Sequence, residues 1–267
     1  GCGIHAHVHL FLSRRFWAHN ARVRMRLLGA AIAFLTRVPI TVKVPFDTAD
    51  VGRSTRWYPL IGAMIGGVYA GMQQLFSSWL PPLVVAVLIV VVEALLTGAL
   101  HMDALADAAD GLGGGWRRED VLRIMRDHVI GSYGGAALIL LILLKVTVIA
   151  ALAQHSNAAY YLVLAPALGR WSIVPLSRFL PYADESRASP AEVVGTTELV
   201  WSTVLALGIT ALGRTWHGFA CWAAAVIATM WFGRFCYRKI GGVTGDTLGA
   251  NIEICECVVL LLGLALS

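Results

Sequence analysis

The stretch at residues 82–100, PLVVAVLIVVVEALLTGAL, decides the fold class. It is a long, predominantly apolar run in which Glu93 is the only charged residue. A helix that crosses a bilayer needs about 20 predominantly apolar residues, with ~17 as the lower end. Six other apolar stretches lie at residues 59–78, 134–153, 158–180, 199–212, 216–233 and 252–266. A shorter stretch at 27–40 contains Arg37, so we expect it to be half-inserted or interfacial. The sequence predicts an all-α polytopic membrane bundle of about seven spans plus this N-terminal segment.

The overall composition supports a membrane protein. Hydrophobic residues make up 58% of the chain and charged residues 14%, and the mean hydropathy is +0.71. Soluble domains lie nearer 45–50% apolar and about 25% charged. This composition excludes an ordinary soluble enzyme, a disordered protein and a fibre. We expect a basic N-terminal extension at residues 1–24 and one membrane-embedded domain at 25–267.

The arginines predict the orientation in the membrane. The chain has 21 Lys and Arg against 16 Asp and Glu, a formal charge of +5. Because the arginines gather between apolar stretches, they favour the positive-inside pattern over a nucleic-acid partner. The loops expected on the cytoplasmic side are 41–58, 101–133, 181–198 and 234–251. The opposite loops, 79–81, 154–157 and 213–215, contain only Arg214. The pattern predicts a cytoplasmic N-terminus and an external C-terminus.

The first segment with chemistry is TGALHMDALADAADG at residues 97–111. Asp103, Asp107 and Asp110 are spaced i, i+4 and i+7, which places them within about 60° of one another on a helix. Like charges on one face repel, and a divalent cation such as Mg²⁺ or Mn²⁺ offsets that repulsion. The alternative is a solvated acidic loop. His101 lies near the opposite face and is expected to be structural.

Two later segments carry further polar groups. Residues 116–135, WRREDVLRIMRDHVIGSYGG, predict an amphipathic surface helix, with Arg126 and Asp127 beside the substrate. Residues 241–256, GGVTGDTLGANIEICE, surround Asp246 with glycines such as Gly245, whose amides can approach an anion.

Ionisable residues also lie within the apolar stretches. Glu253 and Glu256 share a helix face at the membrane, where buried charges are expensive and usually functional. The alternative is that both face headgroup water. Lys145 and Arg170 are expected in a polar cavity that holds phosphate, whereas Glu93 suits a structural role and a site role equally.

Taken together, the segments resemble the cobalamin synthase, or adenosylcobinamide-GDP ribazoletransferase, family. The resemblance rests on 97–111, on IMRDHVIGSYGG at 124–135 and on 241–256. FLTRVPI at 34–40 and RWYPLIGAMIGG at 56–67 also resemble the family. Ala99 and Ala104 replace family glycines and are expected to favour helix formation. Asp184 stands where the family commonly has Arg, which puts a phosphate contact there in doubt.

The resemblance implies a membrane transferase that joins adenosylcobinamide-GDP to α-ribazole or its 5′-phosphate and releases GMP. It implies Mg²⁺ held by Asp103, Asp107 and Asp110, and a catalytic role for these three together with Asp246. Either Asp110 or Asp246 is expected to accept the hydroxyl proton. The residues expected to bind substrate are Arg126, Asp127, Lys145, Arg170, Gly245, Glu253 and Glu256. The expected location is the cell inner membrane, with cytoplasmic site loops, and a homo-oligomer is left open.

Two other functions remain as alternatives. A CDP-alcohol phosphotransferase would need an Ala-Arg pair after Asp110-Gly111, and residues 112–115 read LGGG instead. A secondary transporter would use the intramembrane charges as ion sites and would show inverted repeats. The acidic and glycine-rich segments are not repeats of each other.

Overall fold

The computed structural model describes residues 23–40, 45–184, 189–213 and 216–267. Within these ranges every extended regular element is a helix, and the one β contact is an isolated bridge between Tyr182 and Val243. The prediction of an all-α protein is confirmed.

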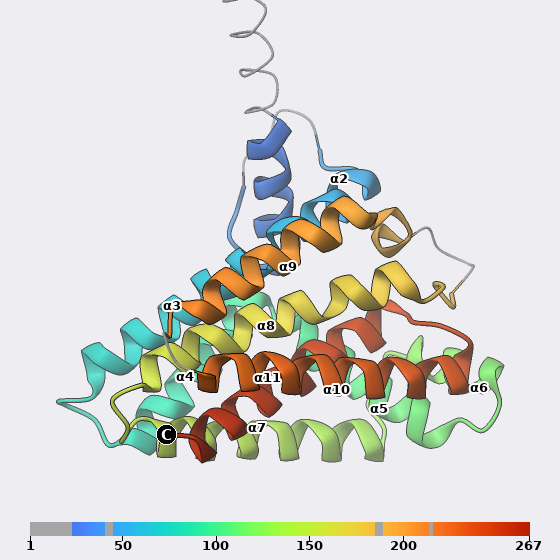
Figure 1. The fold of residues 1–267 in the computed structure, drawn as a ribbon. Coiled ribbons are helices and arrows are strands. Elements are labelled where there is room, and N and C mark those ends of the chain that lie inside the picture. Colours follow the sequence, from blue (N-terminus) through green and yellow to red (C-terminus); the bar gives the residue numbers. More distant parts are fainter. Residues whose placement is uncertain (1–22, 41–44, 185–188, 214–215) are drawn as a thin grey trace, which may run out of the picture.

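Each predicted apolar stretch forms a helix (Figure 1). These helices are α3 (Tyr58–Phe76), α4 (Pro82–Thr97), α7 (Ser132–Leu152), α8 (Ala158–Phe179), α9 (Thr196–Ala211), α10 (Trp216–Ile240) and α11 (Gly245–Ala265). Among the described residues, α7, α10 and α11 are long and apolar enough to cross a membrane. A fourth such unit forms if α4 is counted with the helix that follows it. The protein is therefore a multi-pass helical membrane protein, and seven crossings stay a prediction.

Two helices form the centre of the bundle. Helix α8 packs against α3 and α11, and α11 also packs against α7 and α10. Most of α8 and α11 is buried, including Leu164, Leu168, Ile252 and Val259. Polar side chains on the buried faces of these two helices, such as Arg170 and Glu253, are therefore removed from both lipid and water.

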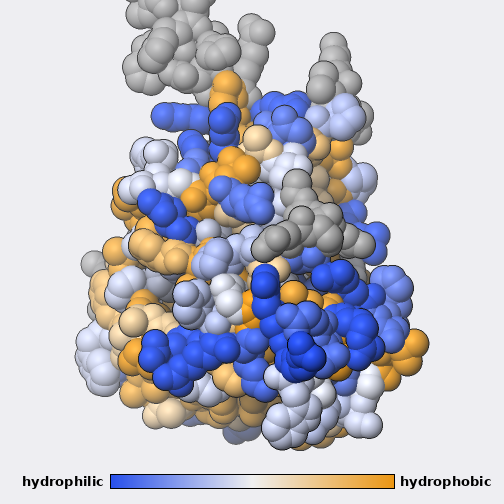
Figure 2. Space-filling view, turned by 90° about the vertical axis from the view of Figure 1, so that its right-hand side faces the viewer, coloured by the Kyte–Doolittle hydropathy of each residue, from blue (hydrophilic) through white to orange (hydrophobic). Residues whose placement is uncertain are grey.

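The short helices lie toward one end of the bundle. They are α2 (Thr48–Ser54), α5 (Leu100–Gly114) and α6 (Arg118–Met125), with 3₁₀ turns at Thr55–Trp57 and Pro190–Val193. Hydrophilic side chains gather on this end, which faces the viewer in Figure 2. The predicted amphipathic helix is confirmed as α6, which buries Val121, Leu122 and Met125.

Helices α4 and α5 meet at a sharp corner. The two axes differ by 90°, and Gly98 and Ala99 between them adopt left-handed φ values of 66° and 55°. Glycine tolerates this conformation, whereas a residue with a Cβ is strained. The expectation that Ala99 favours helix formation is wrong, because this residue lies at the corner and not within a helix.

We expect Ala99→Gly to stabilise the protein. The substitution removes about 1–2 kcal/mol of strain in the left-handed conformation. The greater conformational freedom of glycine in the unfolded chain lowers the free energy of unfolding by about 0.4–1 kcal/mol, so a small net gain remains. The melting temperature in detergent should rise by about 1–2 °C. Ala94→Gly is the matched control within α4 and should lower it by about 2–4 °C. A fall for Ala99→Gly would contradict the strained corner.

The N-terminal apolar segment forms a helix at residues 23–35. Over these residues it buries Leu27, Ala31 and Leu35. The backbone N–H of Arg37 then donates to the carbonyl oxygen of Leu96 at 2.7 Å, which fixes the segment at the end of α4. The predicted domain boundary at 24/25 falls inside this helix, and residues 1–22 lie outside the described part of the chain.

Candidate active site

Helices α5 and α11 bring three carboxylates together. Asp103 is exposed and Asp107 is half-buried on α5, while Asp246 begins α11. Asp246 interacts electrostatically with both Asp107 and Asp103. The helices cross closely because Gly249 packs against Ala104, where an added Cβ would collide. The crossing therefore joins the acidic segment and the glycine-rich segment in one site.

A pocket opens beside these carboxylates. It has a volume of about 240 Å³, and Asp103, Asp246 and His101 contribute to its lining. The other lining groups are mostly apolar and come from the helix at 23–35, α3, α8, α11 and the turn at Pro190–Val193. We call this cavity the carboxylate pocket.

Asp110 lies apart from the carboxylate pocket and caps a helix. One of its oxygens accepts from the N–H of Gly131 at 2.7 Å, and the other accepts from the N–H of Gly134 at 2.9 Å. Both donors lie at the N-terminus of α7, where a carboxylate is also favoured by the helix dipole. A Cβ on either glycine would collide with Asp110. The glycines of the second motif therefore accommodate an aspartate of the first.

We expect Asp110→Asn to destabilise the protein more than Asp103→Asn does. The introduced amide would turn its NH₂ group toward one backbone N–H and leave that donor unpaired, at a cost of about 1–3 kcal/mol. The melting temperature should fall by roughly 5 °C, while Asp103→Asn, at an exposed position, should change it by about 1 °C. Equal melting temperatures for the two variants would contradict the capping role.

The glycine-rich loop has structural uses. Gly241 ends α10 with a left-handed φ of 77°, and Gly242 packs directly on the backbone of Pro181. The N–H of Val243 donates to the carbonyl oxygen of Pro181 at 2.9 Å. The exposed N–H of Gly245 lies 3.3 Å from the hydroxyl of Tyr182. The loop therefore secures the 181–184 segment against the start of α11.

The 181–184 segment separates the carboxylate pocket from a second hollow. Tyr182 lines the carboxylate pocket, whereas Ala183 and Asp184 line a groove of about 470 Å³ on α6. We call it the arginine groove, and its other lining residues are Arg118, Glu119, Leu122, Arg123 and Arg126.

Asp184 has a clear partner in this groove. Its carboxylate lies 3.5 Å from the guanidinium of Arg126. Asp184, which stands where the family commonly has Arg, therefore forms an ion pair with Arg126 instead of adding another cation to the groove. The neighbouring Asp127 accepts from the N–H of Val129 at 3.2 Å in the turn that follows α6.

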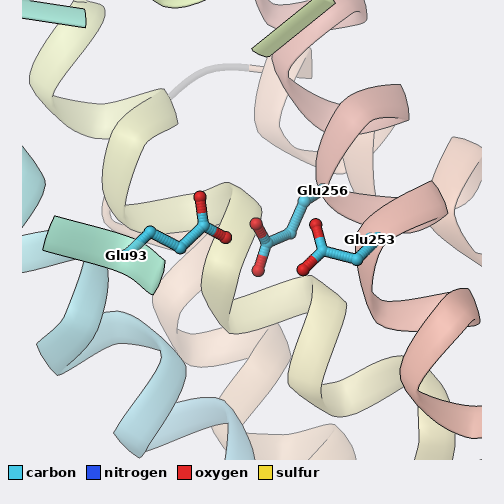
Figure 3. Close-up of side chains that lie close together, drawn as sticks. All are labelled: Glu93, Glu253 and Glu256. Atoms are coloured by element: carbon cyan, nitrogen blue, oxygen red, sulfur yellow. The ribbon is translucent and has the colours of Figure 1, made fainter. Parts of the chain in front are cut away.

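The intramembrane charges form one buried network, and Figure 3 shows its three glutamates pointing toward one another. The ammonium group of Lys145 lies 2.6 Å from Glu93, 2.5 Å from Glu253 and 2.8 Å from Glu256. Glu256 also pairs with Arg170. The glutamates and the two cations are at most 2% exposed, so the alternative that Glu253 and Glu256 face headgroup water is wrong.

The network leaves little room for a ligand. The cavity that Glu93, Lys145 and Glu256 line has a volume of about 10 Å³, which is about the space of one water molecule. A phosphate group does not fit there. The network does reach the carboxylate pocket, because Nδ1 of His101 lies 3.4 Å from the guanidinium of Arg170.

Carboxylates gather at two places in the bundle. Among the described residues, Glu93, Glu253 and Glu256 form the one group of three or more metal-binding side chains whose ligand atoms all lie within 4.8 Å of one another. Lys145 already donates to all three carboxylates. A metal ion would compete with this ammonium group. The carboxylates of Asp103, Asp107 and Asp246 stand farther apart, beside an open pocket.

Fold and site together define a class of protein. A multi-pass helical bundle with acidic residues at its hydrophilic end, next to an arginine groove, has the groups that a membrane transferase needs for phosphate-linked substrates. The chain matches the family model for cobalamin-5-phosphate synthase over residues 27–265, and it belongs to that family.

Curated relatives agree with this family. An adenosylcobinamide-GDP ribazoletransferase of Ralstonia nicotianae is 39% identical over 91% of this chain and 96% of its own length. Proteins of the same name from Shewanella pealeana and Vibrio cholerae are 36% and 32% identical, each over 91% of this chain and 97% and 95% of their own lengths. No solved structure matches the chain.

Proposed function

We propose that the protein joins adenosylcobinamide-GDP to α-ribazole, or to its 5′-phosphate, and releases GMP. The family match and the names of the relatives support this reaction. The observation that carries the proposal is the shared carboxylate pocket, because the two motifs most specific to the family supply its Asp103 and Asp246. A nucleoside bound there has carboxylates beside its hydroxyl group, as a general base requires.

The proposed roles of the carboxylates follow from their surroundings. Asp246 accepts the hydroxyl proton, because it lines the pocket whereas Asp110 is committed to the cap of α7. Asp103, Asp107 and Asp246 would hold Mg²⁺, which prefers carboxylate oxygens. The ion would supply positive charge against the diphosphate of the first substrate.

The arginine groove is the proposed position of that diphosphate. Its volume of about 470 Å³ lies within the ~300–1,000 Å³ of ordinary ligand sites. Arginine donors suit phosphate oxygens, and Arg126 is half-exposed there. Asp127 and Gly245 remain proposed substrate contacts on the same end of the bundle, and the N–H of Gly245 would exchange the hydroxyl of Tyr182 for a substrate oxygen.

The buried charges are proposed to act at a distance. Lys145, Glu253 and Glu256 hold Arg170, which lies beside His101 in the wall of the pocket. These residues therefore position the pocket and do not contact substrate.

We also propose that the site faces the cytoplasm from the inner membrane. The distribution of arginines between the loops supports this orientation. Cysteine placed at exposed Trp116 should escape a membrane-impermeant thiol reagent applied to whole cells, whereas cysteine at exposed Ser156 should react. The reverse labelling pattern would overturn the orientation.

Product analysis with the purified protein tests the reaction. Incubation with adenosylcobinamide-GDP, α-ribazole and Mg²⁺ should give GMP and adenosylcobalamin in equal amounts. Leaving out α-ribazole should abolish both products. A protein that produces no GMP here, and instead releases CMP from a CDP-alcohol, would contradict the proposal and support the phosphotransferase alternative.

A further inference from the structure

We propose that the carboxylate pocket holds the aromatic base of the nucleoside substrate and selects an apolar base over a purine. The inference rests on the proposed function and deepens it by assigning one substrate group to one wall of the pocket. The ligand class is a flat bicyclic aromatic base that carries few polar atoms.

Two aromatic side chains, Phe34 and Tyr58, contribute to the lining of the carboxylate pocket, and we call them its aromatic wall. The rings of Phe34 and Tyr58 stack with their centroids 6.1 Å apart and their planes 15° from parallel. Phe34 is 42% exposed, whereas Tyr58 is buried behind it. Ring stacking at such distances is favourable. A flat base can therefore add to an existing stack, in a pocket that Ile173 and Leu248 also line.

The size of the pocket decides which substrate enters it. A volume of about 240 Å³ lies below the ~300–1,000 Å³ that ordinary drug-sized ligands occupy. One bicyclic base fits within this space. A corrinoid macrocycle with its side chains does not, so the larger substrate must bind outside the pocket.

Three hydroxyls of the lining already take part in hydrogen bonds. The hydroxyl of Thr55 donates to the carbonyl oxygen of Gly52 at 2.7 Å, and the hydroxyl of Ser189 accepts from the N–H of Ala191 at 3.2 Å. The hydroxyl of Tyr182 accepts from Gly245. A purine would lose the water bound to its polar edge and gain few partners here, whereas a benzimidazole gives up less.

The position of the pocket agrees with the chemistry. Asp103 and Asp246 line the same cavity as Phe34 and Tyr58. A nucleoside whose base stacks on Phe34 therefore has its sugar close to the cavity that the carboxylates line. The same geometry brings the hydroxyl to the group that accepts its proton.

Steady-state kinetics of Phe34→Ala test the assignment. The KM for α-ribazole should rise about tenfold, while the KM for adenosylcobinamide-GDP stays within about twofold. Phe219→Ala is the matched control, because Phe219 is 47% exposed on α10 and lies outside the pocket. It should change neither constant. An unchanged KM for α-ribazole in Phe34→Ala, or an equal rise in both constants, would overturn the assignment.

The selectivity is measured with the wild-type protein. The α-linked adenine ribonucleoside should give a kcat/KM at least about tenfold below that of α-ribazole. Equal values would overturn the preference for an apolar base.

A binding measurement separates this inference from the proposed reaction. Should the wild-type protein fail to release GMP, the reaction fails, but calorimetric titration with α-ribazole still tests the pocket. Binding to the wild type that is about tenfold weaker in Phe34→Ala supports the pocket. No binding to the wild type, or equal binding to both proteins, overturns it.

Discussion

Asp107→Asn is expected to lower turnover by about 100- to 1,000-fold while the protein still folds. The substitution keeps the size of the side chain and removes its charge. Asp107 interacts electrostatically with Asp103 on its own helix and with Asp246 on α11. A neutral amide there weakens the negative centre to which both motifs contribute. GMP release under saturating substrate measures the loss.

A control distinguishes this effect from a general loss of acidic charge. Asp120→Asn changes a carboxylate on α6 that lies 3.5 Å from Arg123 and does not line the carboxylate pocket. Its turnover should stay within about twofold of wild type. A folded Asp107→Asn protein with the activity of Asp120→Asn would show that the carboxylates do not act together.

The largest loss of stability is expected for Lys145→Met. The substitution leaves three buried carboxylates with Arg170 alone, which pairs with Glu256. Removing one partner of a buried ion pair costs about 3–5 kcal/mol. The melting temperature in detergent should therefore fall by roughly 10 °C.

Glu93→Gln is the informative comparison for this network. The wild type has three carboxylates and two cations, so this change leaves two of each. Its melting temperature should fall less than that of Lys145→Met, and the double variant should melt above Lys145→Met alone. A Lys145→Met protein that melts within about 2 °C of wild type would contradict a stabilising network.

Local properties could be predicted from the sequence. The seven apolar stretches were predictable as helices because a long run of apolar residues can be recognised without knowing its partners in the fold. The spacing of Asp103 and Asp107 gave their proximity, since one helix carries both. The structural expectation for His101 also agrees with its buried place beside Arg170.

Long-range partners could not be predicted in the same way. Asp110 meets Gly131 and Gly134 only after α5 and α7 pack together. The only sequence signal of this helix cap was an aspartate in one motif and two glycines, spaced i and i+3, in the next motif. Lys145 was expected to face phosphate, but it meets Glu93 and Glu253 from helices far apart in the chain.

Backbone conformation was a second source of error. A family glycine replaced by Ala99 suggested a better helix, because propensity was the only available criterion. The corner between α4 and α5 instead requires a left-handed φ at this position. The aromatic wall of the pocket was missed for a related reason, since Phe34 and Tyr58 stack only in the folded chain.

Binding of Mn²⁺ in place of Mg²⁺ tests the central claim, that α5 and α11 form one metal-holding site at the hydrophilic end. Electron paramagnetic resonance of free Mn²⁺ gives the Kd for the wild type, Asp246→Asn and Glu253→Gln. We predict at least about tenfold weaker binding in Asp246→Asn and a Kd within about twofold of wild type in Glu253→Gln. Loss of Mn²⁺ from Glu253→Gln, with binding unchanged in Asp246→Asn, would place the ion among the buried glutamates and contradict a metal site between α5 and α11.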